Sequence, residues 1–218
     1  MGLMLETVSP QLRARGGVHQ WAPDKDPALR VRMTEEAGEL KIPFTSGILL
    51  GIGENPAERA QSLVATRDIA ARHGHIQEVI IQNFRAKPEI PMADAPEPDE
   101  TEMARAIATA RLVLGAKMNV QAPPNLSPNQ IELFIRAGIN DWGGISPLTR
   151  DYVNPESPWP HIERLAERCD RAGFILSERL AIYPEYLADE WLDPAIAPRV
   201  RAMQERVSGG NGEARGMA

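Results

Sequence analysis

The sequence has little cysteine, no excess of basic charge and no long hydrophobic run, and each of these absences excludes a class of protein. It contains one cysteine, Cys169, which excludes a disulfide framework and a thiolate metal cluster. Its 24 basic and 30 acidic residues give a net charge of -6, which argues against a nucleic-acid or anionic-membrane surface. No apolar stretch reaches transmembrane length, and the first residues lack the basic leader of a secretory signal. We therefore expect a cytoplasmic protein.

The length of the chain, 218 residues, allows one large core. We expect a single domain over residues 1–207 and a flexible tail over residues 208–218, because that segment is rich in glycine and has no apolar period. Residues 87–100, dense in proline and acid, predict a long surface loop. A loop of this length is either a lid or a simple spacer, and the sequence leaves both open.

Five short apolar runs alternate with segments of helical pattern, which predicts an α/β fold. The runs show no polar alternation, as expected for parallel strands that are covered on both faces. Four helices are predicted to begin where a capping residue precedes proline: at Asp26, Asn55, Ser127 and Ser157. Glycines are predicted to close the helices at Gly38, Gly74, Gly115, Gly138 and Gly173. The runs themselves are residues 3–6, 46–54, 79–83, 118–121 and 139–146.

Polar residues stand at the carboxyl ends of the predicted strands, where ligands bind in both barrels and open parallel sheets. Gln82 and Asn83 form an amide pair that can donate and accept at once, which suits the imide edge of a pyrimidine. They could equally hydrogen-bond neighbouring loops. Asn119 and Gln121 are two residues apart and therefore share a face.

The last predicted strand carries the leading catalytic candidate, Asp141, as a proton acceptor or a partner of substrate hydroxyls. It could also cap its turn or pair with an arginine. Asn140 lies beside it as a substrate contact, and Gly143 and Gly144 leave room for a ligand. His19 follows the first run and stays open as a further substrate contact.

A glycine run covers residues 47–54, at the junction of a strand and a helix. Pro56 stands where a dinucleotide motif needs its third glycine, and no P-loop Lys-Ser/Thr follows, so neither phosphate motif is supported. The run is then either a tight turn without a ligand or a strand that approaches one closely.

This run resembles the Gly-x-Ile-x-Gly-x-x-Glu strand of radical S-adenosylmethionine enzymes, which lines the adenine of the cofactor. The resemblance implies that Arg30 binds the methionine carboxylate and that Glu6 contacts the ribose hydroxyls. The residues it assigns to the cofactor are Glu6, Arg30, Gly47, Ile48, Gly51, Gly53 and Glu54.

Longer motifs between residues 2 and 191 are similar to the ring-closing subunit of the 7,8-didemethyl-8-hydroxy-5-deazariboflavin (FO) synthase family. They include residues 2–6, His19 with residues 23–25, and residues 74–84, 122–126, 138–147, 154–156 and 178–184. The resemblance implies a partial TIM-like (β/α) barrel of the radical SAM type, with about five β/α units and a C-terminal helical extension. It covers only the carboxyl-terminal part of such a barrel.

The activity that this resemblance implies is a lyase step in the biosynthesis of the deazaflavin precursor of coenzyme F420. A 5'-deoxyadenosyl radical would abstract hydrogen from the hydroxybenzyl adduct of ribityl-diaminouracil, and cyclisation would release ammonia. Substrate contacts would come from Gln82, Asn83, Asn119, Gln121, Asn140 and Asp141. The implied cofactors are S-adenosylmethionine and a [4Fe-4S] cluster, and the implied partner is the companion hydroxybenzyl-transferring subunit or fused half.

The family's three-cysteine loop, which holds the cluster, has no counterpart in this sequence, and Cys169 alone cannot replace it. The cluster would therefore come from a missing amino-terminal barrel portion, and we expect the isolated chain to be inactive. A second hypothesis is a non-catalytic relic or partner fragment. An ordinary aldolase-like or hydrolytic barrel would need a lysine, or a carboxylate and histidine set, at the strand ends, and the sequence predicts no such set.

Overall fold

A parallel sheet forms the centre of the molecule. The computed structural model describes residues 1–146 and 148–213. Its three strands are β1 (Phe44–Leu50), β2 (Ile76–Asn83) and β3 (Asn119–Gln121), paired in parallel in the order β1-β2-β3. Two extended segments lie beside the outer strands and pair with them through isolated parallel bridges. Residues 2–6 bridge to β1, and Asp141 bridges to Gln121 of β3. The predicted α/β class is confirmed.

All five parallel segments follow one another in space in the order of the sequence, as in an arc of a (β/α) barrel. Runs 3–6 and 139–146 were predicted as strands, but the structure holds them by isolated bridges and backbone hydrogen bonds such as Glu6 N to Gly47 O at 2.9 Å. The arrangement is barrel-like, and a closed radical SAM barrel stays a prediction.

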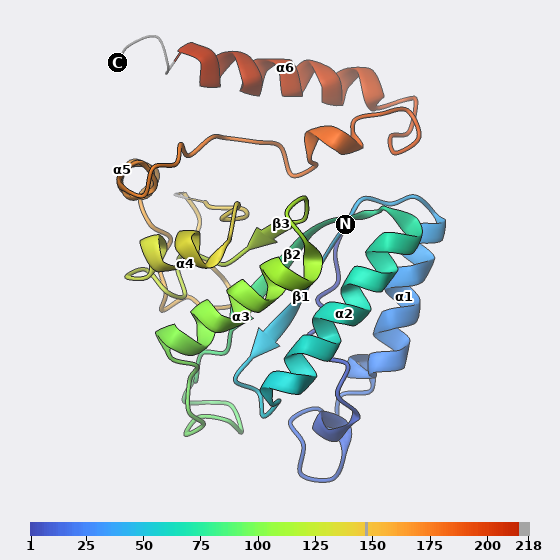
Figure 1. Ribbon diagram of the computed structural model, residues 1–218, viewed down its shortest axis with the longest axis vertical. Coiled ribbons are helices and arrows are strands. Elements are labelled where there is room, and N and C mark those ends of the chain that lie inside the picture. Colours follow the sequence, from blue (N-terminus) through green and yellow to red (C-terminus); the bar gives the residue numbers. More distant parts are fainter. Residues whose placement is uncertain (147, 214–218) are drawn as a thin grey trace.

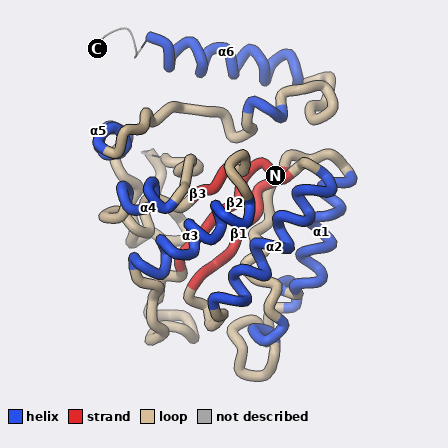
Figure 2. The backbone as a smooth tube through the Cα atoms, viewed as in Figure 1, coloured by secondary structure: helices blue, strands red, loops and turns tan. Residues whose placement is uncertain are grey.

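Six α-helices are connected to this sheet, and Figures 1 and 2 show α2 and α3 lying across one of its faces. The core lies between that face and the helices, where Ile48, Val79 and Val120 pack with residues of α2 to α5. The helices are α1 (Pro27–Glu39), α2 (Pro56–His73), α3 (Glu100–Leu114), α4 (Ile131–Ala137), α5 (Ile162–Arg171) and α6 (Ala197–Glu213); short 3-10 turns are η1 (Pro10–Arg13), η2 (Pro23–Lys25) and η3 (Pro184–Tyr186).

Side chains alternate along each strand, so every second residue faces away from this core. We call this side the second face of the sheet. It carries a mixture of small, apolar and polar side chains, several of them half-buried: Thr45, Gly47, Leu49, Glu78, Ile80, Gln82, Asn119 and Gln121.

Two of the four predicted helix starts are confirmed. Asp26 caps α1, and Asn55 caps α2 in a capping box with Glu58. The starts at Ser127 and Ser157 are wrong, because α4 begins at Ile131 and α5 at Ile162.

The reasons for these two errors are tertiary contacts and a proline. Arg168 of α5 binds the carbonyls of Pro128 and Asn129, which draws them away from a helical path. Pro160 disfavours a helical conformation at Trp159, so no helix can include both.

Glycines close α2, α3 and α4 as predicted, at Gly74, Gly115 and Gly138, each with a positive φ. Gly173 also has a positive φ, one residue after the end cap of α5. The prediction for Gly38 is wrong, because α1 continues to Glu39. A Cβ at Gly38 would lie 2.5 Å from Cγ of His73, so this glycine lets α1 and α2 approach each other.

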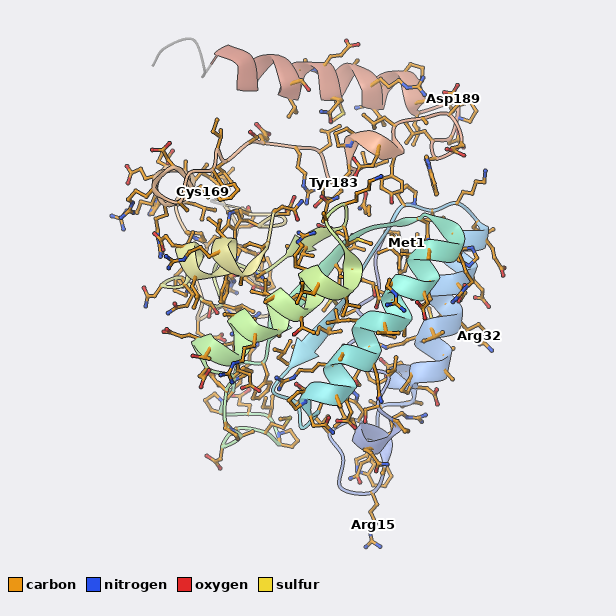
Figure 3. All side chains as sticks on the ribbon, in the orientation of Figure 1. Met1, Arg15, Arg32, Cys169, Tyr183 and Asp189 are labelled. Atoms are coloured by element: carbon orange, nitrogen blue, oxygen red, sulfur yellow. The ribbon has the colours of Figure 1, made fainter. Side chains whose placement is uncertain are left out.

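The two ends of the sheet carry different segments. The β1 arrow points away from η3 and α6, toward the loop around η1 (Figure 1). Arg15 lies toward the carboxyl end of β1, whereas Tyr183 and Met1 lie toward its amino end (Figure 3). The predicted long loop is present as residues 84–99, between β2 and α3.

The carboxyl-terminal part of the described chain runs from α5 through η3 to α6. Helix α6 ends at Glu213, so residues 208–213 of the predicted tail are helical, and residues 214–218 lie outside the described residues. Within the part of the chain that the structure describes, every helix is too short or too polar to span a membrane.

Candidate functional site

Glu6 lies at the carboxyl end of the first extended segment and collects three basic partners. Its φ of 62° is unusual for a residue with a side chain, and the residue is buried. The carboxylate pairs with Lys25 Nζ, with His19 Nε2 at 3.2 Å and with Arg30 NH1 at 3.3 Å. These partners come from η2, from the loop before it and from α1. We call these four residues the Glu6 cluster.

His19 contributes a nitrogen without a partner to this cluster. Burial lowers the pKa of His19, and the nearby Glu6 carboxylate raises it by less. The lowered pKa favours the neutral imidazole at pH 7, and its Nε2 lies 3.2 Å from the Glu6 carboxylate. Nδ1 is buried, and no group of the described residues hydrogen-bonds to it. This atom can accept a hydrogen bond from a ligand.

The predicted carboxylate ligand, Arg30, is held tightly by its own chain. Its Nε donates to the Asp24 carbonyl at 2.9 Å, and NH1 donates to the Met4 carbonyl as well as to Glu6. Only 6% of its side chain is exposed, compared with 29% for Lys25. The structure thus brings Glu6 and Arg30 together, and Lys25 is the more accessible cation beside them.

The glycine run forms the end of β1 and the turn that follows. Gly51 and Gly53 have φ values of 88° and 104°, which favour glycine. The buried carboxylate of Glu54 accepts hydrogen bonds from the amides of Gly51 and Ile52, both at 2.9 Å. The turn is therefore held from within by one carboxylate.

Two other residues assigned to the cofactor have close structural neighbours. A Cβ at Gly47 would lie 2.3 Å from the Ile80 carbonyl oxygen, so this glycine allows β1 and β2 to pack. Ile48 is 1% exposed, and its side chain lies in the core under the helices. It can reach a ligand only through its backbone.

The amide pair at the end of β2 is divided between the two faces of the sheet. Gln82 is half-buried on the second face. Asn83 is buried and donates from Nδ2 to the Leu126 carbonyl at 3.4 Å. Asn83 therefore satisfies a neighbouring loop, which is the alternative interpretation that the sequence left open.

Asn119 and Gln121 do share a face, but both contact protein groups. Asn119 Nδ2 donates to the Gln77 carbonyl at 2.8 Å, and its Oδ1 accepts from Asn140 Nδ2 at 2.8 Å. A Cβ at Gly143 would lie 1.7 Å from Gln121 Nε2. The expectation that Gly143 and Gly144 leave room for a ligand is therefore wrong for Gly143, because Gln121 fills that room, whereas a Cβ at Gly144 would meet no atom of the described residues within 4 Å.

Asp141 belongs to a second group of residues, the Asp141 cluster, with Glu78, Arg179 and Tyr183. Arg179 donates to its carboxylate from Nε at 2.5 Å and from NH2 at 2.8 Å, and the Tyr183 hydroxyl donates at 2.8 Å. The Gly143 amide also donates to it at 2.6 Å. Asp141 therefore caps its turn and pairs with an arginine, as the simpler alternative stated; a catalytic role stays a prediction.

Two carboxylates share one guanidinium in the Asp141 cluster. Burial raises the pKa of Asp141, but the hydrogen bonds and the charge of Arg179, together with the hydrogen bonds from Gly143 and Tyr183, lower it by more, so the carboxylate stays ionised. Burial and the neighbouring Asp141 raise the pKa of Tyr183, so its phenol stays protonated. Glu78 accepts from Tyr183 and from Arg179, both at 3.1 Å.

The predicted site residues thus fall into separate groups. The Glu6 cluster and the glycine turn lie at carboxyl strand ends, whereas the partners of Asp141 come from the segment around Tyr183, near the opposite end (Figure 3). Sequence reasoning did not assign Glu78, Arg179 and Tyr183 to the site; the signals were that all three lie in the family-like motifs and that Asp141, if buried, needs an arginine. The expectation of no carboxylate, histidine and lysine set at the strand ends is wrong, because Glu6, His19 and Lys25 form one.

The residues fit one of the two implied cofactors. Among the described residues, no group of three His, Cys, Asp or Glu side chains could hold a metal ion, and the sole cysteine is buried with a raised pKa caused by burial. A [4Fe-4S] cluster does not fit these residues. A carboxylate for hydroxyls, an accessible ammonium for a carboxylate and a free buried imidazole nitrogen do fit S-adenosylmethionine.

Comparisons with known proteins give one consistent result. No protein-family model matches the chain. It is 50% identical over 212 residues to the FO synthase of Streptomyces avermitilis, covering 96% of this chain and 25% of that protein. It is 48% identical over 206 residues to the 7,8-didemethyl-8-hydroxy-5-deazariboflavin synthase of Methanothermobacter thermautotrophicus, covering 94% and 62%. The synthase of Methanopyrus kandleri is 50% identical over 215 residues, covering 99% and 63%. The chain thus spans less than two thirds of these relatives.

Proposed function

From the premise that this chain is homologous to part of the 7,8-didemethyl-8-hydroxy-5-deazariboflavin (FO) synthases, we propose that it forms a binding wall for the ring-closing lyase step. That step converts 5-amino-5-(4-hydroxybenzyl)-6-(D-ribitylimino)-5,6-dihydrouracil into the deazaflavin and releases ammonia. The observation that carries the proposal is about 50% identity over nearly the whole chain, together with Glu6 and Arg30 meeting at one strand end.

The cofactor side of this wall would be the Glu6 cluster and the glycine turn. Glu6 would accept the ribose hydroxyls, while Arg30, with Lys25 beside it, would attract the methionine carboxylate. Backbone groups of residues 47–54 would line the adenine. S-adenosylmethionine would supply the hydrogen-abstracting chemistry of the ring closure, and its [4Fe-4S] partner would need ligands that this chain does not provide.

The substrate side would use the polar residues at the ends of β2, β3 and the last extended segment. The side chains of Gln82 and Gln121 lie on the second face of the sheet, where amide groups can recognise a pyrimidine edge. Asn83, Asn119 and Asn140 would act by fixing the loops and backbone around that face, as their contacts indicate. Asp141 would hold the last segment in place or contact substrate directly.

The remaining part of the relatives' length would supply the cluster, either from another segment or from a separate polypeptide. The companion hydroxybenzyl-transferring subunit or fused half would supply the substrate. The competing hypothesis is a relic or partner fragment that binds neither cofactor nor substrate.

Calorimetric titration with S-adenosylhomocysteine tests the cofactor wall without any cluster chemistry. We expect the chain to bind it and Glu6→Gln to weaken binding by at least about tenfold, because a charged acceptor is lost. Glu36→Gln is the matched control, since Glu36 lies exposed on α1 with only Arg32 as its partner.

Absence of binding by the unaltered chain would favour the relic. A further assay mixes the chain with the cluster-bearing portion of an archaeal relative and measures deazaflavin fluorescence. Fluorescence that appears with the chain and disappears with Glu6→Gln supports the enzyme.

A further inference from the structure

The first turns of α2 lie beside the glycine turn, and one residue there, Arg59, bridges two carboxylates. Its Nε donates to Glu54 Oε1 at 2.6 Å, and its NH2 donates to Glu102 Oε1 at 2.5 Å. The side chain of Arg59 is 11% exposed and that of Glu54 is 2% exposed. Glu102 belongs to α3, so Arg59 connects the end of β1 to a helix that follows the long loop 84–99.

Three neighbouring groups compensate for the burial of Glu54. A carboxylate at this depth is unfavourable unless hydrogen bonds and an opposite charge compensate for the lost water. The amides of Gly51 and Ile52 supply two hydrogen bonds, and Arg59 supplies the charge. Burial lowers the pKa of Arg59, but the hydrogen bonds to Glu102 and Glu54 and the charges of these two carboxylates together raise it by more, so the guanidinium stays charged.

The same turn is in contact with the long loop. A Cβ at Gly51 would lie 2.6 Å from Cδ of Pro98, so the end of that loop packs directly on the turn. Helix α3 begins two residues later at Glu100 and carries Glu102. The conformation of the turn is therefore set from two sides: by Pro98 through packing and by Arg59 through Glu54.

We propose that Arg59 is a positioning residue of the cofactor wall. It orients Glu54, which in turn holds the Gly51 and Ile52 amides in the turn that would contact adenine. The identity of the ligand rests on the proposed function, whereas the action on the turn does not. A lysine cannot replace Arg59 fully, because the planar guanidinium bonds to two carboxylates on different elements at once and an ammonium lacks that fork.

Hydrogen exchange of the backbone amides tests the action on the turn. In Arg59→Gln we expect Gly51 and Ile52 to exchange at least about tenfold faster, with Arg59→Lys in between. The matched control is Arg67→Gln, because Arg67 lies exposed on α2 and pairs only with its neighbour Asp68. The Ile81 amide of β2 should keep its rate in every variant, which shows that the fold is intact. Unchanged rates at Gly51 and Ile52 in folded Arg59→Gln would overturn the proposal.

If Arg59→Gln does not fold, Arg59→Lys and Glu102→Gln decide the question. Glu102→Gln keeps the Arg59 and Glu54 pair, so we expect its turn amides to exchange less than about threefold faster, and less than in Arg59→Lys. Equal acceleration of exchange in both variants would contradict the proposal. It would mean that the turn is stabilised by the contact of Arg59 with α3 and not by its bond to Glu54.

Ligand discrimination separates positioning from a general loss of structure. The unaltered chain and Arg59→Lys are titrated with S-adenosylhomocysteine and with S-inosylhomocysteine, which differ only in the base. We expect the preference for adenine to fall in Arg59→Lys, whereas an equal loss of affinity for both ligands would contradict a positioning role. If the unaltered chain binds neither, the proposed function fails, and the exchange rates alone decide whether Arg59 holds the turn.

Discussion

Single residues with buried charge determine much of this structure, and Arg179 is the clearest case. It compensates two buried carboxylates, those of Glu78 and Asp141, from a distance of about 100 and 38 positions in the chain. Its guanidinium also lies 4.1 Å from the ring centroid of Tyr183. The site therefore depends on a residue that no strand or helix pattern reveals.

Replacing Arg179 with methionine should lower the free energy of unfolding by about 3–5 kcal/mol, because two buried carboxylates lose their counter-charge. Urea denaturation at pH 7 measures this. Arg67→Met, which removes an exposed arginine, should change stability by less than about 0.5 kcal/mol. A loss below about 1 kcal/mol for Arg179→Met would show that water compensates Asp141 and Glu78.

At this scale the sequence predicted positions better than contacts. It placed Glu6 and Gly51 at strand ends, because apolar runs and their polar ends are visible in the chain, and it singled out Arg30 only through the family resemblance. It could not show that Asn83 turns to a loop carbonyl or that Gln121 fills the space beside Gly143. Those outcomes depend on which face a side chain takes and on neighbours far away in sequence.

Helices and strands form the next scale, and here local signals were reliable only where no distant residue competed. Asn55 caps α2 through bonds to the Ala57 and Glu58 amides, all within its own turn. Ser127 offered the same pattern, but Arg168 binds the carbonyls beside it, and the helix begins later. A cap motif therefore predicts a helix only when its carbonyls are free to join it.

The contact between α4 and α5 should make the free energy of unfolding depend on pH. Hydrogen bonds from Arg168 lower the pKa of Glu132 from 4.5 to about 2. Because the folded pKa is depressed, this pair stabilises the fold above pH 4.5, and the contribution disappears as the pH falls toward 2. Since Glu132 is partly exposed, solvent screening reduces the contribution to about 1 kcal/mol.

The comparison is between the unaltered chain and Glu132→Gln in urea at two pH values. We expect a difference of about 1 kcal/mol at pH 7 that shrinks to less than about half at pH 3. Glu167→Gln, at an exposed position in the interior of α5, should show little difference at either pH. A constant difference across this range would exclude a role for ionisation.

For the whole molecule, the α/β class and the parallel order followed from the repeated strand and helix pattern. The same pattern did not predict that the outer segments pair weakly. Residues 2–6 and 139–146 look as apolar as the strands, and yet they pair through isolated bridges. How far a strand extends depends on its neighbour across the sheet, which the local pattern does not contain.

Helix α6 should contribute little to the stability of the rest. Ala197 at its start is buried, but the following side chains that the structure describes are half-buried or exposed, including Met203 at 41%. Removing residues 204–218 should therefore change the free energy of unfolding by less than about 0.5 kcal/mol. Thermal and urea denaturation of the shortened chain measure this, and a loss above about 2 kcal/mol would show that α6 packs on the domain more closely than its exposure indicates.

The Asp141 cluster has a consequence for synthesis on the ribosome. Among the described residues, Glu78 and Asp141 share one cationic partner, Arg179, and Tyr183 adds hydrogen bonds to both; these two residues emerge roughly 100 residues after the first of the carboxylates. Until then the nascent sheet carries two uncompensated anions, so its early strands cannot settle into their final arrangement. The sheet should therefore reach its native arrangement only after Tyr183 has left the ribosome, and a holdase chaperone has that interval in which to act.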